Sequence, residues 1–208
     1  MIGGLYAITR ETDDSTRLLS EVEAALRGGA AVVQYRDKSG DVARQHEQAS
    51  ELLAICKRYR APLIINDSLR LADLVGADGV HLGRDDGGIR EARIVLGPEK
   101  IIGVSCYQSL DLALAAQTAG ADYVAFGSFF ASPTKPDAPR ADIALLQHAS
   151  RVLHLPIVAI GGITPDNAES LIEAGADALA VIHALFEAAD IEARARCFAD
   201  FFIAETED

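Results

Sequence analysis

The sequence has few cysteines, no basic leader and no long apolar run. Its three cysteines, Cys56, Cys106 and Cys197, are scattered and odd in number, and they show neither a disulfide framework nor the spacing of a metal site. We interpret them as reduced packing thiols of a cytoplasmic protein. The N-terminus lacks a basic region followed by an apolar segment, so we expect no secretory signal. No apolar stretch reaches the roughly 18 residues that a membrane span needs.

Basic residues are also in short supply. The chain has 19 Lys and Arg against 31 Asp and Glu, which gives a formal net charge of −12. This balance argues against nucleic acid or an anionic membrane surface as a partner. A phosphate-bearing ligand would therefore need positive charge that is concentrated locally, from basic side chains or a bound metal.

Short apolar runs alternate with longer amphipathic segments along the whole chain. The predicted strands are Leu5–Thr9, Ala31–Tyr35, Leu63–Asn66, Gly79–Leu82, Ile101–Ser105, Tyr123–Phe126, Ile157–Ile160 and Ala178–Val181. Predicted helices include Ser15–Arg27, Val42–Tyr59, Leu110–Ala119, Ile143–Val152 and Pro165–Ala174. Because the strand runs are apolar throughout, they indicate a sheet that is covered on both faces.

Eight strand–helix units in about 200 residues predict an α/β fold, a single (β/α)8 TIM barrel. The alternative is a doubly wound open sheet. A weak repeat favours the barrel, because a Gly-Ala pair precedes four of the predicted strands, at Gly29, Gly76, Gly120 and Gly175. The glycine suits the left-handed turn that ends a helix. We see no linker and with 208 residues, half of them apolar, expect one domain over residues 1–208.

One loop concentrates groups that suit an anion. The apolar run Tyr123–Phe126 stops at Gly127, and the loop that follows holds Ser132, Thr134 and Lys135. Two hydroxyls and an ammonium so close together favour binding of an anion such as phosphate. The alternative is a solvated loop that happens to contain these residues.

A second polar group follows the second predicted strand. Gln34, Arg36 and Lys38 alternate there, and a period of two places all three on one side of an extended chain. Two cations and an amide beyond a buried strand favour anion binding. The alternative is a solvated strand end.

Two carboxylates stand at neighbouring strand ends. Asp67 follows Asn66 at the end of the third strand, and Asp86 follows the fourth. The alternative for each carboxylate is a helix N-cap. Beside a basic cluster in an acidic protein, we expect the pair to hold Mg²⁺ facing a diphosphate, because Mg²⁺ uses one or two carboxylates together with waters and ligand phosphates.

The remaining strand ends also carry polar or small residues. We interpret His81 as a hydrogen-bonded pocket residue, and Ser105, with no base nearby in the sequence, as a polar contact rather than a nucleophile. Gly162 follows the seventh strand, and Ile182 and His183 follow the eighth. Barrel phosphates commonly bind at these two loops, where backbone N–H groups can approach them. For the glycine, the alternative is a tight turn.

In this order and spacing, these motifs resemble those of the thiamine-phosphate synthase family, over nearly the whole chain from the first strand to the eighth. They comprise Gln34-Tyr35-Arg36-Asp37-Lys38, Asn66-Asp67, residues 79–86, Gly103-Val104-Ser105, Ser132-Pro133-Thr134-Lys135 and residues 159–163. The family joins a hydroxymethylpyrimidine diphosphate to a thiazole phosphate, releasing diphosphate and leaving thiamine phosphate. The resemblance therefore implies a transferase with two small-molecule substrates and Mg²⁺ as cofactor. It leaves the oligomeric state open.

The resemblance also implies a role for each matching residue. The residues that would hold the pyrimidine diphosphate are Gln34, Tyr35, Arg36, Asp37, Lys38, Asn66, Ser105 and Lys135, with Tyr35 and Asp37 acting through their backbone. Of these, Arg36, Lys38, Ser105 and Lys135 are the expected catalytic residues. The thiazole phosphate would be held by Ser132, Pro133, Thr134, Gly162, Ile182 and His183. Asp67 and Asp86 would bind Mg²⁺.

Three positions depart from the family pattern, and two other functions compete with the synthase. Arg84 stands where the family usually has Gln, Ser132 where Thr is common and His183 where Ser is common. One alternative is a thiazole tautomerase of the same barrel group, which needs neither diphosphate nor Mg²⁺. The other is a non-catalytic sensor of a phosphate ligand. The combination of three basic residues with the two carboxylates argues against the tautomerase. Against the sensor, we see no extra segment for interaction with a partner protein.

Overall fold

The computed structural model describes residues 2–131 and 139–203. Eight parallel strands close into one barrel, in which each strand pairs with the next and the last pairs with the first. The strands are β1 Gly4–Ile8, β2 Val32–Tyr35, β3 Leu63–Asn66, β4 Gly79–Leu82, β5 Ile101–Tyr107, β6 Tyr123–Gly127, β7 Ile157–Ile160 and β8 Ala178–Val181. The predicted (β/α)8 barrel is confirmed, and the open-sheet alternative is wrong because β1 pairs with β8 through Leu5 and Leu179.

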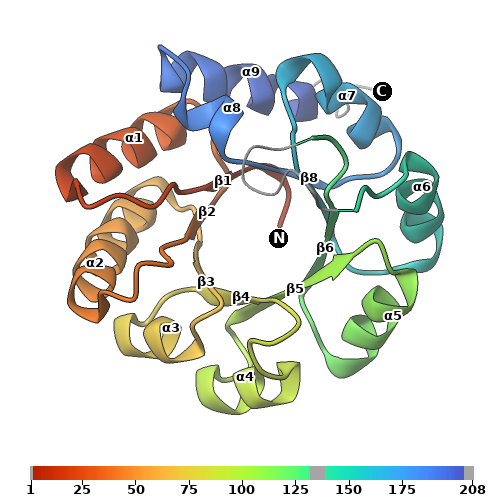
Figure 1. Ribbon diagram of the computed structural model, residues 1–208, viewed down its shortest axis with the longest axis horizontal. Helices are drawn as coiled ribbons and strands as arrows, with labels where there is room; N and C mark the ends of the chain where they lie inside the picture. Colours follow the sequence, from red (N-terminus) through yellow and green to blue (C-terminus); the bar gives the residue numbers. More distant parts are fainter. Residues whose placement is uncertain (1, 132–138, 204–208) are drawn as a thin grey trace.

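Helices form a ring outside the strands, with α9 beside α1 and α7 (Figure 1). They are α1 Ser15–Arg27, α2 Val42–Tyr59, α3 Leu69–Val75, α4 Ile89–Leu96, α5 Leu110–Ala119, α6 Ile143–Val152, α7 Pro165–Glu173, α8 His183–Phe186 and α9 Ile191–Ile203. The four predicted helices that match α1, α2, α5 and α6 are confirmed to the residue, and the fifth ends one residue early at Glu173. No helix in the described ranges has the length and apolarity needed to cross a membrane.

Short polar side chains start several of these helices. Asp14, Asp41, Ser68 and Ser109 each accept a hydrogen bond from the backbone N–H three residues further on. These bonds satisfy backbone donors that would otherwise have no partner at the helix start. At the other end of a helix, each of the four Gly-Ala repeats places its glycine at a positive φ, between +69° and +100°. The predicted left-handed turns are therefore confirmed.

The apolar core has two parts, one on each side of the strand wall. Successive side chains of a strand point to opposite faces. In β1, Leu5 and Ala7 accordingly pack in the cluster between strands and helices, whereas Tyr6 and Ile8 pack inside the barrel. The inner cluster also contains Tyr123. The barrel interior is thus a packed region in which any polar group must find a partner among its neighbours.

One glycine makes room for a ring inside the barrel. A Cβ atom on Gly103 would lie 2.0 Å from Cζ of Tyr123. We expect Gly103→Ala to lower the free energy of unfolding by about 1–3 kcal/mol, because the buried ring cannot move aside without strain. Urea unfolding of the two proteins measures this.

Gly3→Ala is the matched control, because a Cβ there meets only the Asp177 carbonyl oxygen at 3.4 Å, an ordinary contact. Equal stability of both alanine variants would show that the Tyr123 ring does not depend on the glycine.

Candidate functional site

The side chains at the end of β2 and just after it divide between the barrel and helix α2. Gln34 is buried inside the barrel. Tyr35 instead faces α2, where its hydroxyl donates to Gln48 Oε1 at 2.8 Å. The Asp37 carboxylate lies on that side too and accepts from the Ser39 N–H at 2.7 Å. Tyr35 and Asp37 therefore use their side chains to hold α2, which leaves only their backbone for a ligand, as the resemblance implies.

The environment of Asp37 keeps it ionised. Burial acts to raise the pKa of this carboxyl group, but hydrogen bonds from Ser39 and the charge of Arg44 outweigh burial and hold the pKa below its ordinary value. The next residue along, Lys38, turns away from α2 and pairs with Asp67. Arg36 is half-buried and is fixed by its backbone N–H, which donates to Thr9 Oγ1 at 2.9 Å.

Asp67 and Asp86 lie together at the ends of β3 and β4. The Asp67 carboxylate accepts from Asn66 Nδ2 at 2.7 Å and contacts the Lys38 ammonium, and Asp86 Oδ2 accepts from the Gly83 N–H at 2.9 Å. Burial acts to raise the pKa of Asp67, but hydrogen bonds from Lys38 and Asp86 lower it. Burial and the hydrogen bond with Asp67 raise the pKa of Asp86. Because the two carboxyl groups lie so close together, the ionised Asp67 disfavours ionisation of Asp86.

The helix-cap alternative for these carboxylates is wrong. The N-cap of α3 is Ser68, whose hydroxyl accepts from the Leu71 N–H at 3.1 Å, and the N-cap of α4 is Gly88. Asp67 also adopts a φ of +62°, a conformation that is uncommon outside glycine and that concentrates at functional sites. Neither carboxylate therefore serves as a helix N-cap.

The donor set at this place fits one particular kind of metal ion. Within residues 2–131 and 139–203, no group of three or more His, Cys, Asp and Glu side chains could hold a metal. The chain thus offers the pair Asp67 and Asp86 rather than a full cage. A two-carboxylate set suits Mg²⁺, which keeps waters and takes further oxygens from a ligand phosphate.

A row of hydrogen bonds crosses the barrel interior from β2 to β5. Gln34 Nε2 donates to Tyr6 Oη at 2.8 Å, and Tyr6 Oη lies 2.7 Å from Tyr123 Oη. Tyr123 Oη lies 2.9 Å from His81 Nδ1, and His81 Nε2 lies 2.8 Å from Ser105 Oγ. We call these five side chains the interior row. It joins two of the residues expected to hold the pyrimidine diphosphate, Gln34 and Ser105.

The expectation that Ser105 has no base nearby was wrong, because His81 contacts its hydroxyl. No local residue pattern predicts this contact, since it depends on the register that sets His81 opposite Gly103. The contact does not make Ser105 a nucleophile. Burial lowers the pKa of His81 to about 4, although the Asp67 charge acts to raise it. The imidazole is thus a weak base, and its Nδ1 faces a phenol instead of a carboxylate.

The loops after β6 and β7 are bonded to one another. The Phe129 and Phe130 N–H groups donate to Ile160 and Gly161 at 3.1 and 2.9 Å. A Cβ on Gly162 would lie 2.3 Å from the Ala131 carbonyl oxygen. Close packing of the two loops is therefore enough to require a glycine at position 162. This structural reason applies whether or not a phosphate binds there.

The thiazole side of the site is described only in part. Ser132, Pro133, Thr134 and Lys135 lie outside the described residues. Ile182 is the N-cap of the short helix α8, which begins at His183. The His183 ring lies 4.0 Å from the Glu187 carboxylate.

Two residues near the site were missed in the sequence. Gln108 Nε2 donates to the Gly127 carbonyl at 2.9 Å and to the Pro139 carbonyl at 2.7 Å, so it connects the two described ends of the loop between β6 and α6. Tyr107 supports Arg84, whose guanidinium lies 5.0 Å from the centre of the Tyr107 ring. Nothing in the local sequence marks either residue, because both contacts join segments far apart in the chain.

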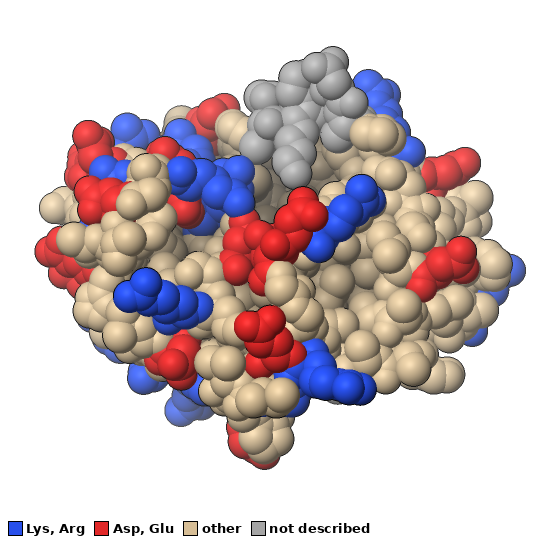
Figure 2. Space-filling view, turned by 60° about the horizontal axis from the view of Figure 1, so that its bottom comes forward, with Lys and Arg blue, Asp and Glu red and all other residues tan. Residues whose placement is uncertain are grey.

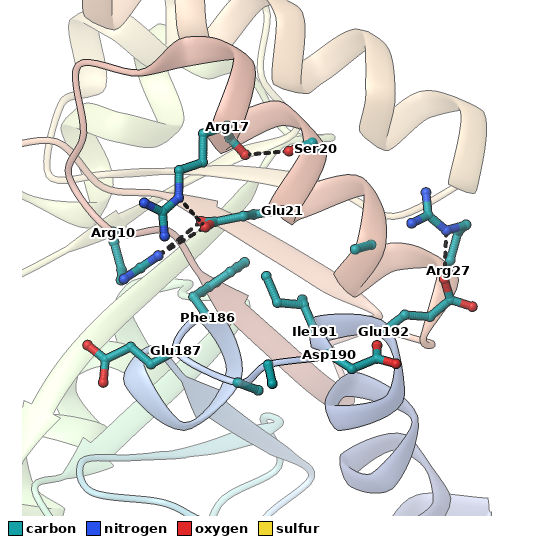
Figure 3. Close-up of a pocket in the computed structure, with 13 residues that line it drawn as sticks. Arg10, Arg17, Ser20, Glu21, Arg27, Phe186, Glu187, Asp190, Ile191 and Glu192 are labelled. Carbon is teal, nitrogen blue, oxygen red and sulfur yellow. Dashed lines mark hydrogen bonds and ion pairs between the residues drawn. The ribbon is translucent and has the colours of Figure 1, made fainter.

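A cavity of about 740 Å³ lies away from these residues, between α1 and the segment from α8 to α9 (Figure 3). Its basic residues are already paired. Arg10 and Arg17 both contact Glu21, at 3.1 and 2.7 Å, and Arg27 contacts Glu192 at 2.8 Å. None of the expected site residues lines it. On the face shown in Figure 2, basic and acidic side chains likewise lie side by side.

Together, the fold and the site define a (β/α)8-barrel protein whose polar groups converge where strands β2 to β5 end. The family model described as thiamine monophosphate synthase matches residues 5–185. The chain belongs to the thiamine-phosphate synthase family, whose members are transferases.

Individual relatives agree with this assignment. The chain is 69% identical to a thiamine-phosphate synthase of Thiobacillus denitrificans, over 99% of this chain and 98% of the relative. It is 60% identical to one of Methylobacillus flagellatus, over 97% and 96%. Among solved structures, a thiamine phosphate pyrophosphorylase of Pyrococcus furiosus superposes with a TM-score of 0.87 at 32% identity, over 98% of this chain and 96% of that one.

The buried imidazole predicts a specific loss of stability in acid. The unfolded chain takes up a proton near the ordinary pKa of 6.5, whereas the folded chain does so only near 4. The free energy of unfolding should therefore fall as the pH decreases through this interval, by about 2 kcal/mol between pH 7 and pH 5 from His81 alone. Urea unfolding at the two pH values measures the loss.

The comparison variant is His81→Gln, which cannot titrate in this range. Its stability should fall by about 2 kcal/mol less over the same interval than that of the unmodified protein. An equal fall in both proteins would mean that the folded imidazole titrates normally.

Proposed function

We propose that the chain joins an aminopyrimidine carrying a diphosphomethyl group to a thiazole phosphate, or its carboxylated tautomer, giving thiamine phosphate and diphosphate in thiamine biosynthesis. The observation that carries this proposal is the meeting of Asp67 and Asp86 with Lys38 and Asn66 at the ends of neighbouring strands. Two carboxylates and an ammonium at one point suit a diphosphate that arrives with a divalent cation.

Asp67 and Asp86 are the residues that would hold Mg²⁺. When bound, this ion neutralises negative charge on a departing diphosphate. Lys38 already lies against Asp67, so its ammonium is placed to reach the same phosphate oxygens. Arg36 and Lys135 complete the proposed positive charge around the leaving group. Preorganised charges of this kind act where charge develops in the transition state.

The proposed reaction is a dissociative substitution. The reacting carbon is a benzylic-type CH₂ on an electron-rich ring, so the C–O bond can break first and the thiazole nitrogen can capture the resulting cation. Such a route needs no strong base and no covalent nucleophile. The weakly basic His81 beside Ser105 is compatible with this route, because Ser105 then serves as a polar contact to the pyrimidine.

The second substrate would bind beside the loops after β6, β7 and β8. Ser132 and Thr134 would contribute hydroxyls to its phosphate, with Pro133 shaping the loop, and Gly162, Ile182 and His183 would contribute mainly backbone N–H groups. The thiazole nitrogen would then be oriented toward the pyrimidine carbon. We place the enzyme in the cytoplasm, in keeping with its three free cysteines.

Removing either carboxylate should slow the reaction without unfolding the protein. Asp67→Asn keeps a side chain that tolerates a positive φ, and Asp86→Asn keeps an oxygen that can accept from the Gly83 N–H. We expect each variant to lower kcat by about 10²–10³-fold, by analogy with the loss of other preorganised charge contacts. A coupled assay for thiamine phosphate gives the rate.

Asp85→Asn is the matched control, because Asp85 is exposed and stands next to the proposed ligand. It should retain the full rate and the full response to added Mg²⁺. Unchanged rates in the Asp67 and Asp86 variants would remove both residues from the mechanism.

Calorimetric titration separates the synthase from its two rivals. The synthase should bind the pyrimidine diphosphate more tightly with Mg²⁺ than without it, and should form product once thiazole phosphate is added. A tautomerase would bind the thiazole phosphate alone. A sensor would bind a phosphate ligand and form no product. Asp67→Asn should lose the effect of Mg²⁺ on binding while still folding.

A further inference from the structure

The interior row is a continuous chain of hydrogen-bonding groups. Its members come from β2, β1, β6, β4 and β5 in turn, and the three between its ends are almost fully buried, with Tyr6 1%, Tyr123 0% and His81 8% exposed. Water cannot replace a missing partner in such a place. Each proton of Tyr6, Tyr123 and His81 must therefore be matched to an acceptor within the row itself.

This requirement gives the row a direction. The side-chain amide of Gln34 donates to Tyr6 Oη, so the single proton of Tyr6 is directed to Tyr123 Oη. The proton of Tyr123 is then directed to His81 Nδ1, which must accept it. A neutral imidazole that accepts at Nδ1 carries its proton on Nε2. The Nε2–H group donates to Ser105 Oγ.

The direction of the row decides what its two ends can offer a ligand. Because the Ser105 oxygen already accepts from His81, its own proton remains free to donate. Because the Gln34 nitrogen donates inward, its amide oxygen remains free to accept. The two ends thus present one acceptor and one donor.

We propose that Tyr6, Tyr123 and His81 are positioning residues that fix Gln34 as acceptor and Ser105 as donor, and so select an aminopyrimidine over an oxopyrimidine. An aminopyrimidine offers an N–H₂ donor next to a ring nitrogen that accepts. The oxo analogue offers the reverse, a carbonyl acceptor next to a ring N–H donor. The proposal rests on the proposed function, because Gln34 and Ser105 are the pyrimidine contacts in that function.

The first test reads the His81 tautomer in the free protein, by ¹⁵N NMR of histidine-labelled enzyme at neutral pH. The signals of His81 are assigned by their loss in His81→Gln. We expect a protonated Nε2 and an unprotonated Nδ1. A proton on Nδ1 would reverse the row and overturn the proposal. This measurement involves no substrate, so it stands even if the proposed function fails.

The second test interrupts the row in the middle. Tyr123→Phe keeps the ring but removes the hydroxyl, which leaves His81 Nδ1 without its donor. We expect a mixture of tautomers, and a fall of about 10-fold in the ratio of kcat/KM for the aminopyrimidine diphosphate over its oxo analogue. Tyr6→Phe should act in the same direction.

Tyr59→Phe is the control, because Tyr59 is exposed on α2 and its hydroxyl contacts Glu23, at 3.2 Å, and Arg27, neither of which belongs to the row. This variant should keep both the tautomer and the ratio of the unmodified protein. An unchanged ratio in Tyr123→Phe, with His81 still protonated on Nε2, would overturn the positioning role. Absence of turnover in the unmodified protein would instead refute the proposed function.

Discussion

The pairing of β1 with β8 is the constraint on which the rest of the molecule depends. It turns a twisted sheet into a barrel, and so creates an interior that water does not fill. Every polar side chain that points inward must then be satisfied by another. The same closure brings the carboxyl ends of all eight strands to one rim. Residues far apart in the chain, such as Lys38 and Asp67, are thereby placed in contact.

Local properties of the chain were predictable from the sequence because they depend on neighbouring residues. Apolar runs marked the strands, four of them to the residue, including Leu63–Asn66 and Ile157–Ile160. The Gly-Ala pairs marked helix ends for a simple steric reason. Strand order also followed, since right-handed crossovers leave few ways to arrange eight parallel strands. The clustering of Asp67 with Asp86 was predictable from this strand order, because β3 and β4 are adjacent.

Contacts that depend on register across the barrel were not predictable. The bond between His81 and Ser105 requires that β4 and β5 be aligned in one particular way, and no residue type signals that alignment. The same is true of Gln108, which joins two ends of a loop that it does not belong to. Sequence reasoning therefore found the residues of the rim more readily than the residues that support them from inside.

The electrostatic design explains how an acidic protein can serve an anionic substrate. Several of its basic side chains are paired with neighbouring carboxylates, as with Arg27 and Glu192 or Arg93 and Asp122. At the proposed site two carboxylates, Asp67 and Asp86, lie side by side with the Lys38 ammonium paired to Asp67, which leaves room for one further cation. Under the proposed function, a substrate that brings its own divalent ion would meet a site that is complementary to the complex and not to the bare anion.

The glycine at position 103 has a consequence for how such a barrel can evolve. Its missing side chain leaves the space that the Tyr123 ring fills, so substitutions at positions 103 and 123 depend on one another. A larger residue at position 103 is tolerated only after a smaller residue has replaced Tyr123. Geometry therefore fixes the order of the two substitutions, with the one at 123 preceding the one at 103.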